Sequence, residues 1–425
     1  MKEHTTVAPI QATIEKMVYG GEGLARVQGQ VLLAPMVLPG ELVEIQPVKD
    51  DRRLLRGRVT KILETSPHRI AAACQYFAQC GGCHYQHAPY EDQLRFKADI
   101  LVETLRRIGK LDAPEPEIVS GEPWAYRNRA QFKAVKRGRD FHIGYLEAAS
   151  NRLVDIEACP IVSPAINALL PELREVGQRS DFKNGTAEIE IVDGGGEILI
   201  TVRSDERFPD TLVTALRERV PSLVSIARGD AQGGFFKLWG SGHVTCPASG
   251  FGYRVSHGVF FQVNRFMADA LAEVSTRDLS GNLALDLYSG AGYFTLPLAR
   301  RFAKVEAVET NSAAVRDLRA NCAIAKIENV GTHRVATTDY LAGYDGPVPD
   351  AILLDPPRAG LGPGGAKHLA KLGAPTIVYV ACDPPTLSRD LALLVAAGYK
   401  LEKVFMVDLF PQTFHIESVV ILRNG

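Results

Sequence analysis

The sequence of 425 residues predicts a multidomain protein with an N-terminal all-β, OB-like barrel, a central α+β domain and a C-terminal α/β domain. Three observations lead to this fold class. The chain is long enough for roughly three domains of about 150 residues each. Short strand patterns separated by Gly and Pro fill its beginning, and apolar strands alternate with helix-compatible segments from residue 283 onward. We place the three domains at residues 1–64, 65–250 and 251–425.

The composition narrows the class of protein. Hydrophobic residues make up 46% and charged residues 23% of the chain, and its formal net charge is −1. No apolar run approaches the roughly 18 residues that span a bilayer, and no signal-peptide pattern follows Met1, so we expect a cytoplasmic protein without a membrane partner. A net charge near zero neither supports nor excludes RNA, so any contact with nucleic acid must come from local clusters of Lys and Arg.

The first two domains are described by short strand patterns. Residues 7 to 64 contain QATIEKMVYG, VQGQVLLAP, ELVEIQPV and LRGRVTKIL, which are typical of about five strands in a small barrel. Residues 117 to 250 contain AEIEIV, EILITV and FFKLWG, interrupted by a helical stretch at 208–219. Between them a helix is expected over residues 91 to 110, where apolar residues stand at helical spacing: Leu94, Ala98, Leu101, Leu105 and Ile108.

The C-terminal domain alternates strands and helices. The strands are LALDLY, KVEAVE, DAILLDPP and TIVYVAC, each followed by a turn and a helix-compatible segment. This alternation predicts a parallel sheet wrapped by helices, with ligands bound outside the carboxyl ends of the strands. The last two runs, LEKVFMVDLF and IESVVILR, are joined by a turn at Pro411 and predict a hairpin at the sheet edge.

The loop DLYSGAGYF (286–294) follows the first of these strands. Gly290 and Gly292 let the backbone turn sharply and approach a ligand, but the third glycine of a dinucleotide fingerprint is replaced by Thr295. Glu309 ends the next strand, 19 residues after Gly290, where a carboxylate would accept hydrogen bonds from ribose hydroxyls. An adenosine ligand without phosphates fits this pattern better than NAD. The alternative is a tight strand-to-helix turn with no ligand.

Two further strand ends provide candidate functional residues. Asp355 opens the motif DPPR at the binding edge, although two prolines alone would equally suit a rigid loop. Cys382 ends TIVYVAC just before a helix that starts near Thr386, and a helix N-terminus favours a thiolate. A cysteine in a strand is otherwise a small buried hydrophobe.

A thiolate suits methylation of uracil at carbon 5. This carbon is a poor nucleophile, but addition of a thiolate to carbon 6 produces an enolate that attacks an electrophilic methyl group. A base must then remove the proton on carbon 5 so that the cysteine can leave. Glu417 is the candidate base, with His415 nearby, although a Glu that opens a strand is otherwise an exposed polar residue.

Four cysteines form a possible metal site. Cys74, Cys80 and Cys83 lie within ten residues, and Cys159 follows at a distance. Four thiolates are enough for a tetrahedral zinc ion or a [4Fe-4S] cluster, and the spacing leaves both open. The alternative is four unrelated buried cysteines.

The segment WAYRNRAQFKAVKRGR (124–139) is a candidate RNA surface. It contains six Lys or Arg, three aromatic residues and no acid, which suits phosphates and stacked unpaired bases. A charge run is otherwise a solvated face. The candidate RNA-binding residues here are Arg127, Arg129, Phe132 and Lys133, and the N-terminal unit adds a basic run of Arg52, Arg53, Arg56, Arg58 and Lys61.

Several of these segments together resemble a known family. FFQVN (260–264), DLYSGAGYF, VEAVE, DPPR, the Cys382 segment and FHIES resemble, in order, the RNA uridine-5-methyltransferases that act on ribosomal or transfer RNA. The resemblance covers essentially the whole chain. It implies a Rossmann-like class I methyltransferase domain behind an N-terminal TRAM barrel, with Cys382 as nucleophile and Glu417 as base.

The resemblance also implies ligands and partners. The cofactor is S-adenosylmethionine, and similarity to members with a CGGC sequence favours a structural [4Fe-4S] cluster on Cys74, Cys80, Cys83 and Cys159 over zinc. We expect a monomer that modifies 23S rRNA, with transfer RNA as the alternative. The implied cofactor contacts are Gln262, Tyr288, Gly290, Tyr293, Glu309, Asp339 and Asp355, the last standing between the cofactor and the target base.

The sequence departs from the family pattern beside the nucleophile. Asp383 replaces the usual Asn and Ala381 the usual Ser, and the added negative charge of Asp383 would disfavour a thiolate. Two other functions remain to be weighed. An amino-group methyltransferase would carry an aromatic residue after the two prolines, where this chain has Arg358. A catalytically silent RNA-binding protein would have lost the nucleophile or the cofactor acid, and both are present.

Overall fold

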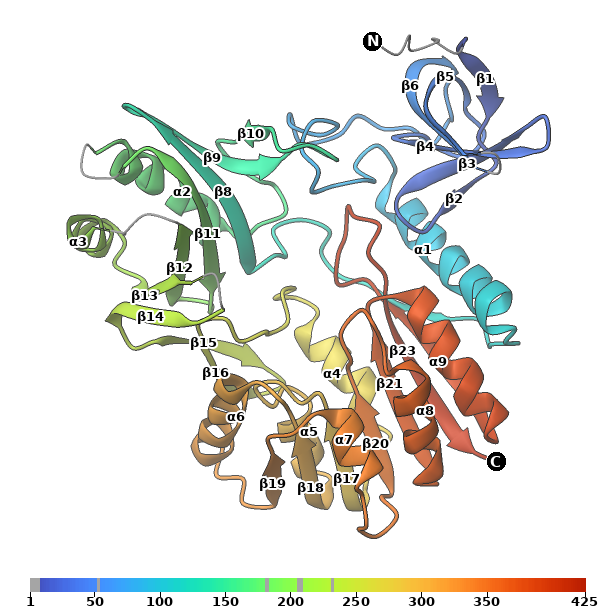
Figure 1. The fold of residues 1–425 in the computed structure, drawn as a ribbon, viewed down its shortest axis with the longest axis vertical. Helices are drawn as coiled ribbons and strands as arrows, with labels where there is room; N and C mark the ends of the chain where they lie inside the picture. The colour runs from blue at the N-terminus through green and yellow to red at the C-terminus, as the bar shows by residue number, and fades with distance from the viewer. Residues whose placement is uncertain (1–7, 52–53, 180–182, 205–208, 231–232) are drawn as a thin grey trace.

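The structure is a computed structural model, and it describes residues 8–51, 54–179, 183–204, 209–230 and 233–425. Figure 1 shows three sheet-based parts: the N-terminal strands at the upper right, the central strands at the left, and the C-terminal sheet with its helices below. Within the described residues, no helix is long and apolar enough to cross a membrane.

The N-terminal part is a six-stranded sheet in the order β1-β5-β6-β4-β3-β2, in which only β4 and β6 pair in parallel. Its strands are β1 (Ile10–Thr13), β2 (Lys16–Val18), β3 (Glu22–Val27), β4 (Gln30–Pro35), β5 (Leu42–Asp51) and β6 (Leu54–Glu64). Ala25, Leu32, Val43 and Ile45 are fully buried between them. The predicted all-β character of this unit is confirmed.

The central part is a seven-stranded sheet in the order β10-β9-β8-β11-β12-β13-β14. Its elements are β8 (Arg129–Arg137), β9 (Asp140–Leu146), β10 (Leu153–Asp155), α2 (Pro164–Gln178), β11 (Gly185–Asp193), β12 (Ile198–Ser204), α3 (Asp210–Arg219), β13 (Leu223–Gly229) and β14 (Phe235–Gly240). Helices α2 and α3 cover one face and bury apolar residues against it. A separate hairpin, β15 (His243–Ala248) and β16 (Phe251–Ser256), leads to the last part.

The C-terminal part is an eight-stranded sheet in the order β19-β18-β17-β20-β21-β23-β22-β7. The strands from β17 to β21 are parallel, and β23 runs antiparallel between β21 and β22. The predicted terminal hairpin is therefore present, but β7 (Glu117–Val119) forms the edge. The strands are β17 (Gly281–Leu287), β18 (Phe302–Val308), β19 (Val330–His333), β20 (Ala351–Leu354), β21 (Thr376–Ala381), β22 (Tyr399–Val407) and β23 (Glu417–Asn424).

Helices pack on both faces of this sheet. One apolar cluster joins α4 (Ala268–Thr276), α5 (Thr295–Ala299) and α6 (Ser312–Ile324) to one face. A second joins α8 (Gly362–Lys371) and α9 (Pro384–Ala396) to the other, near α7 (Thr337–Ala342). The strand order reverses between β17 and β20, and such a switch point is where open α/β sheets bind ligands.

The helix expected after the cysteine segment is present but belongs to the C-terminal part. It is α1 (Tyr90–Thr104), followed by a short π-helical turn, Leu105–Gly109. Its residues Phe96 and Ile100 share the apolar cluster of α9, and β7 (Glu117–Val119) pairs with β22. The predicted central domain, 65–250, therefore contains a segment that packs with the methyltransferase-like sheet instead.

Candidate active site

The loop after β17 turns over the switch point. Gly290 and Gly292 have φ angles of 54° and 93°, a region that favours glycine. A Cβ on Gly290 would meet open space, whereas one on Gly292 would lie 2.4 Å from Leu318 Cδ1 on α6. Gly290 therefore leaves room for a ligand, and Gly292 is required by packing against the helix.

Glu309 lies against this loop, as predicted. Its Oε2 accepts a hydrogen bond from Gly290 N at 3.0 Å, and its Oε1 accepts one from Asn311 N at 2.7 Å. The carboxylate is thus fixed at the carboxyl ends of β17 and β18, where ribose hydroxyls could donate to it.

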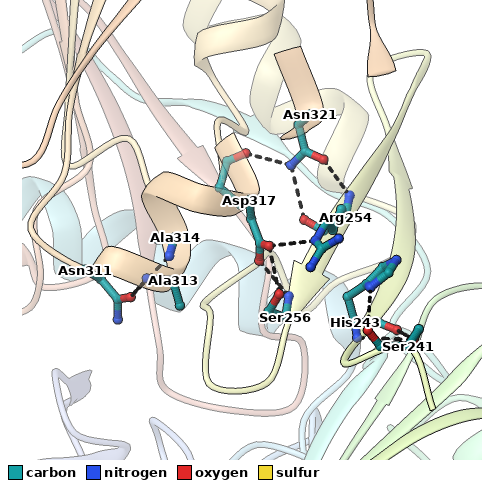
Figure 2. Close-up of polar contacts among 10 residues, drawn as sticks. Ser241, His243, Arg254, Ser256, Asn311, Ala313, Ala314, Asp317 and Asn321 are labelled. Atoms are coloured by element: carbon teal, nitrogen blue, oxygen red, sulfur yellow. Dashed lines mark hydrogen bonds and ion pairs between the residues drawn. The ribbon is translucent and has the colours of Figure 1, made fainter. Parts of the chain in front are cut away.

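Figure 2 shows polar contacts at the start of helix α6 and between this helix and β16. Asn311 caps the helix by accepting from Ala313 N at 2.8 Å. Further along, Asp317 accepts from Arg254 Nε of β16 at 3.0 Å. Asn321 donates from its amide to Ala291 O inside the loop at 2.9 Å. The helix therefore ties the hairpin, the acid and the loop into one unit.

Asp286 is an acid that the sequence prediction missed, although it opens the motif. It is 1% exposed and accepts a hydrogen bond from the Thr295 hydroxyl, while its Oδ1 has no hydrogen-bond partner in the described part of the chain. Burial raises its pKa to about 7, and the charges of Asp355 and Glu309 add to this effect. The residue that replaces the third glycine, Thr295, thus supports the acid.

Three predicted residues meet at the same edge of the sheet. Asp355 follows β20 and Cys382 follows β21, and these parallel strands are neighbours. Glu417 opens β23, whose next residue pairs with the last residue of β21 in antiparallel register. Asp355, Cys382 and Glu417 therefore lie at the same edge of the sheet as the loop 286–294, and their roles in the reaction stay predictions.

The electrostatics of this edge are dominated by buried acids. Burial raises the pKa of Glu417 well above its ordinary value, and the Asp355 charge raises it further. Burial likewise raises the pKa of Asp355 to about 7. The pKa of the Cys382 thiol is raised to about 12 by burial and by the charges of Glu417, Asp355 and Asp383, and Arg358 opposes them. Without substrate, the thiol is held protonated.

Two cationic or polar groups border the thiol. Arg358 Nη2 lies 3.3 Å from His415 Nδ1, and burial with the nearby Arg358 charge lowers the pKa of His415 to about 4. The imidazole is therefore neutral at pH 7. Asp383 caps α9, because its Oδ1 accepts a hydrogen bond from Thr386 N at 3.0 Å. The residue that departs from the family pattern therefore stabilises the start of this helix.

Comparison with known proteins decides the family. The model of the tRNA (Uracil-5-)-methyltransferase family matches residues 89–425, close to four-fifths of the chain. The chain belongs to the RNA (uracil-5-)-methyltransferase family. It is therefore an enzyme of that class.

Relatives of this methyltransferase span its whole length. An uncharacterized RNA methyltransferase of Aquifex aeolicus is 35% identical, covering 98% of each chain. A 23S rRNA (uracil(1939)-C(5))-methyltransferase RlmD of Edwardsiella ictaluri is 34% identical, covering 95% of this chain and 93% of the relative. The crystal structure of Pyrococcus abyssi tRNA (uracil-54, C5)-methyltransferase with S-adenosyl-L-homocysteine has the same fold, with a TM-score of 0.77 at 24% identity, covering 97% of this chain and 100% of that one.

Three further predicted cofactor residues of the methyltransferase are buried or half-buried: Gln262, Tyr288 and Tyr293. Gln262 is buried ahead of α4, and Tyr288 is half-buried and hydrogen-bonded to Thr337. Tyr293 is buried, with its ring against Phe261 and its hydroxyl donating to Ala268 O, so it forms a wall of the site.

Asp339 differs from these residues in being exposed, and its predicted cofactor contact stays a prediction. Its side chain lies on α7 and lines a hollow together with Asn282, Lys304 and His333, the last residue of β19. Thr337, two residues earlier in α7, is buried and hydrogen-bonded to Tyr288. Spacing alone did not distinguish the two.

The four predicted cysteine ligands line one cavity of about 370 Å³, together with Arg127, Phe414 and His415. Gly82 N donates to Cys80 Sγ at 3.4 Å, and a Cβ on Gly81 would lie 3.1 Å from Leu146 O, so the backbone approaches closely here. Among the described residues, no three His, Cys, Asp or Glu side chains are gathered tightly enough for one metal ion. Four cysteines that line one cavity are a donor set of the kind that binds zinc or a [4Fe-4S] cluster, and the choice between these stays open here.

The basic segment of the methyltransferase alternates along β8. Phe132 is fully buried against α2 and α3, so the prediction that it stacks on RNA bases is wrong for this ring. Arg129 and Lys133 point to the opposite face, but they pair with Glu190 and Glu188 of β11. Local sequence could not show these acids, because they arrive from a neighbouring strand.

The remaining basic residues are less constrained. Arg127 donates from Nε to Arg129 O at 2.8 Å and borders the cysteine cavity. In the N-terminal sheet, Arg56 pairs with Glu22 at 3.2 Å, while Arg58 and Lys61 are exposed. Arg52 and Arg53 lie outside the described residues.

Proposed function

We propose that this protein is an S-adenosylmethionine-dependent methyltransferase that forms 5-methyluridine in RNA, with 23S rRNA as the substrate. The observation that carries the proposal is the placement of Cys382 and Glu417 on adjacent strand ends beside Asp355 and the loop 286–294. Relatives named for 23S rRNA cover nearly the full chain, which favours ribosomal RNA. Transfer RNA is the alternative, because the matching family model is named for it.

Gly290, Glu309, Tyr288 and Gln262 would hold the cofactor at the switch point. S-adenosylmethionine, when bound, supplies an electrophilic methyl group and a positive charge. Burial raises the pKa of Asp286 and of Asp355 to about 7, and a bound cation would favour the ionised form of both acids.

The proposed reaction begins at Cys382. Its thiolate forms a bond to carbon 6 of uracil, and the thiol proton passes to a neighbouring carboxylate. Carbon 5 of the resulting enolate would form a bond to the methyl carbon while the bond between that carbon and the sulfonium sulfur breaks, which leaves S-adenosylhomocysteine. Glu417 then accepts the proton of carbon 5, and the electron pair of that C–H bond restores the double bond as the cysteine leaves. The raised pKa of Glu417 makes it a stronger base than an exposed carboxylate.

The accessory parts serve RNA and structure in this proposal. The N-terminal sheet acts as a TRAM RNA-binding domain, and the exposed Arg58 and Lys61 support this role. Cys74, Cys80, Cys83 and Cys159 hold a [4Fe-4S] cluster, supported by their shared cavity. Its part is structural, since methyl transfer to carbon 5 needs no electron. Iron and sulfide content after anaerobic purification distinguishes the cluster from zinc.

The function is tested with labelled S-adenosylmethionine and separate 23S rRNA and transfer RNA transcripts, followed by mass spectrometry of the nucleosides. Label in 5-methyluridine of the ribosomal transcript is expected; label only on an amine or ribose would overturn the reaction, and label only in transfer RNA would overturn the substrate. Cys382→Ala should abolish turnover, with Cys246→Ala as the matched control. Glu417→Gln should accumulate a denaturation-resistant protein–RNA adduct, because elimination fails.

A further inference from the structure

The turn between β2 and β3 brings the N-terminal sheet to the catalytic edge. Tyr19 in this turn donates from its hydroxyl to Asp383 Oδ2 at 3.2 Å, and Asp383 directly follows Cys382. The Tyr19 ring stands edge-on to Phe414, with 5.7 Å between the ring centroids. Phe414 belongs to the loop that leads to Glu417. One side chain of the N-terminal sheet therefore contacts the neighbour of the nucleophile and the loop that carries the base.

Several independent contacts hold the turn between β2 and β3 in place. Gly21 has a φ of 83°, and a Cβ there would lie 3.1 Å from the His84 side chain. Met17 is buried in the apolar cluster that also contains residues of α1 and α9. Lys16 of β2 forms an ion pair with Glu103 of α1 at 2.6 Å. The contact of Tyr19 is thus part of a packed interface between the two sheets.

Both oxygens of Asp383 are occupied. Oδ1 accepts from Thr386 N at 3.0 Å and from the Thr386 hydroxyl at 2.9 Å, and Oδ2 accepts from Tyr19. The charged groups that act on Cys382 include Glu417, Asp355, Asp383 and Arg358, and among these four Arg358 is the cation. A carboxylate whose oxygens accept hydrogen bonds opposes a nearby thiolate less than a free one does.

We propose that Tyr19 is a positioning residue for the reaction: its hydroxyl holds the Asp383 carboxylate in the cap of α9 and partly compensates its charge beside Cys382. The inference rests on Cys382 being the nucleophile, as proposed above. It gives the N-terminal sheet a part in catalysis that is separate from any contact with RNA. Tyr19 itself stays protonated, because burial and Asp383 raise its pKa above the ordinary value.

The test measures alkylation of Cys382 by iodoacetamide from pH 7 to 10 in the intact protein, with peptide mass mapping to single out this thiol. Tyr19→Phe keeps the ring against Phe414 and removes only the hydroxyl. We expect alkylation about fivefold slower at pH 8, since the uncompensated Asp383 charge raises the thiol pKa. In turnover assays kcat should fall by about the same factor while KM for RNA is unchanged, because RNA contacts are retained.

Two variants separate this role from a structural one. Lys16→Gln removes the ion pair to Glu103 at the same interface and should leave alkylation unchanged. Asp383→Asn should speed alkylation, and adding Tyr19→Phe to it should have no further effect. Wild-type alkylation in Tyr19→Phe, or equal slowing in Lys16→Gln, would overturn the proposal. The assay contains neither RNA nor cofactor, so its failure is distinct from turnover retained by Cys382→Ala, which would refute the proposed function.

Discussion

At the scale of single residues, the edge of the sheet beside Cys382 holds several carboxyl groups that are buried away from water. Asp286, Asp355 and Glu417 are each raised in pKa by burial, and the last two also interact with each other. An acid whose pKa is higher in the folded than in the unfolded protein lowers stability as pH rises between the two values. For Asp286, that window runs from its model-peptide value of 3.8 to about 7.

Asp286→Asn should therefore remove part of the pH dependence of stability. Between pH 5 and pH 8 the free energy of unfolding of the wild type should fall by up to about 3 kcal/mol more than that of the variant. The Asn carbonyl can still accept from Thr295, which keeps the loop supported. Urea unfolding of the cofactor-free protein at both pH values measures the difference. Asp345→Asn, at an exposed position, is the control; parallel losses in wild type and Asp286→Asn would contradict the argument.

Sequence was informative about residues whose function depends on strand ends. Gly290 with Glu309, and Cys382 with Glu417, follow from the rule that carboxyl ends of parallel strands share an edge. The sequence was uninformative where the orientation of a side chain determines whether that side chain is buried or exposed. Asp339 and Thr337 lie two positions apart in one helix, yet only Thr337 is buried by the loop. Phe132 sits in a basic run, but alternation along β8 turns its ring into the core.

At the scale of elements, the loop between β22 and β23 is held from several directions. Lys97 of α1 donates to Asp408 Oδ1 at 2.6 Å and to Phe410 O at 2.9 Å. His84 N donates to Gln412 O at 2.8 Å, and the Tyr126 hydroxyl donates to Pro411 O at 3.0 Å. Because Glu417 begins the strand after this loop, these contacts set the position of the proposed base.

Lys97→Met should destabilise the protein strongly. Lys97 and Asp408 are both fully buried, and removing one partner leaves the other charge unpaired, at a cost of about 3–5 kcal/mol. Urea unfolding should show this loss, and kcat should fall because the loop before Glu417 is released. The double variant Lys97→Met with Asp408→Leu should recover stability, since no unpaired charge remains. A single variant as stable as the wild type would refute the importance of the pair.

The apolar residues that predicted helix α1 do not all lie on its buried face, although Leu101 and Leu105 do. The expected apolar stripe included Leu94, Ala98 and Ile108, but the first two are half-buried and Ile108 is 51% exposed. The buried face contains Lys97, whose partner lies 311 residues further along the chain. Helical periodicity predicts that a helix exists, but a polar residue with a distant partner cannot be assigned to the core from local pattern.

At the scale of the molecule, the cysteine segment is where the three parts meet. Gly81 N donates to Leu146 O of the central sheet, and His84 N donates to the loop before β23. Gly21 of the N-terminal sheet packs on His84. The domain boundaries predicted from composition cross this junction, because contacts between distant segments, not changes in sequence pattern, assign residues 90–119 to the C-terminal sheet.

Removing one of the four proposed cysteine ligands should therefore make the loop between β22 and β23 more mobile. Cys80→Ala removes a donor from the shared cavity, whose wall includes Phe414 and His415. We expect iron to be lost and amide hydrogen exchange in residues 408–416 to become about tenfold faster, because the segment that bonds Gln412 is no longer tethered. Exchange in β17 should be unchanged, since its ladder lies within the C-terminal sheet. Cys246→Ala, outside the cavity, is the control. If iron is lost while 408–416 keep wild-type protection, the cysteine site does not support the loop that positions Glu417.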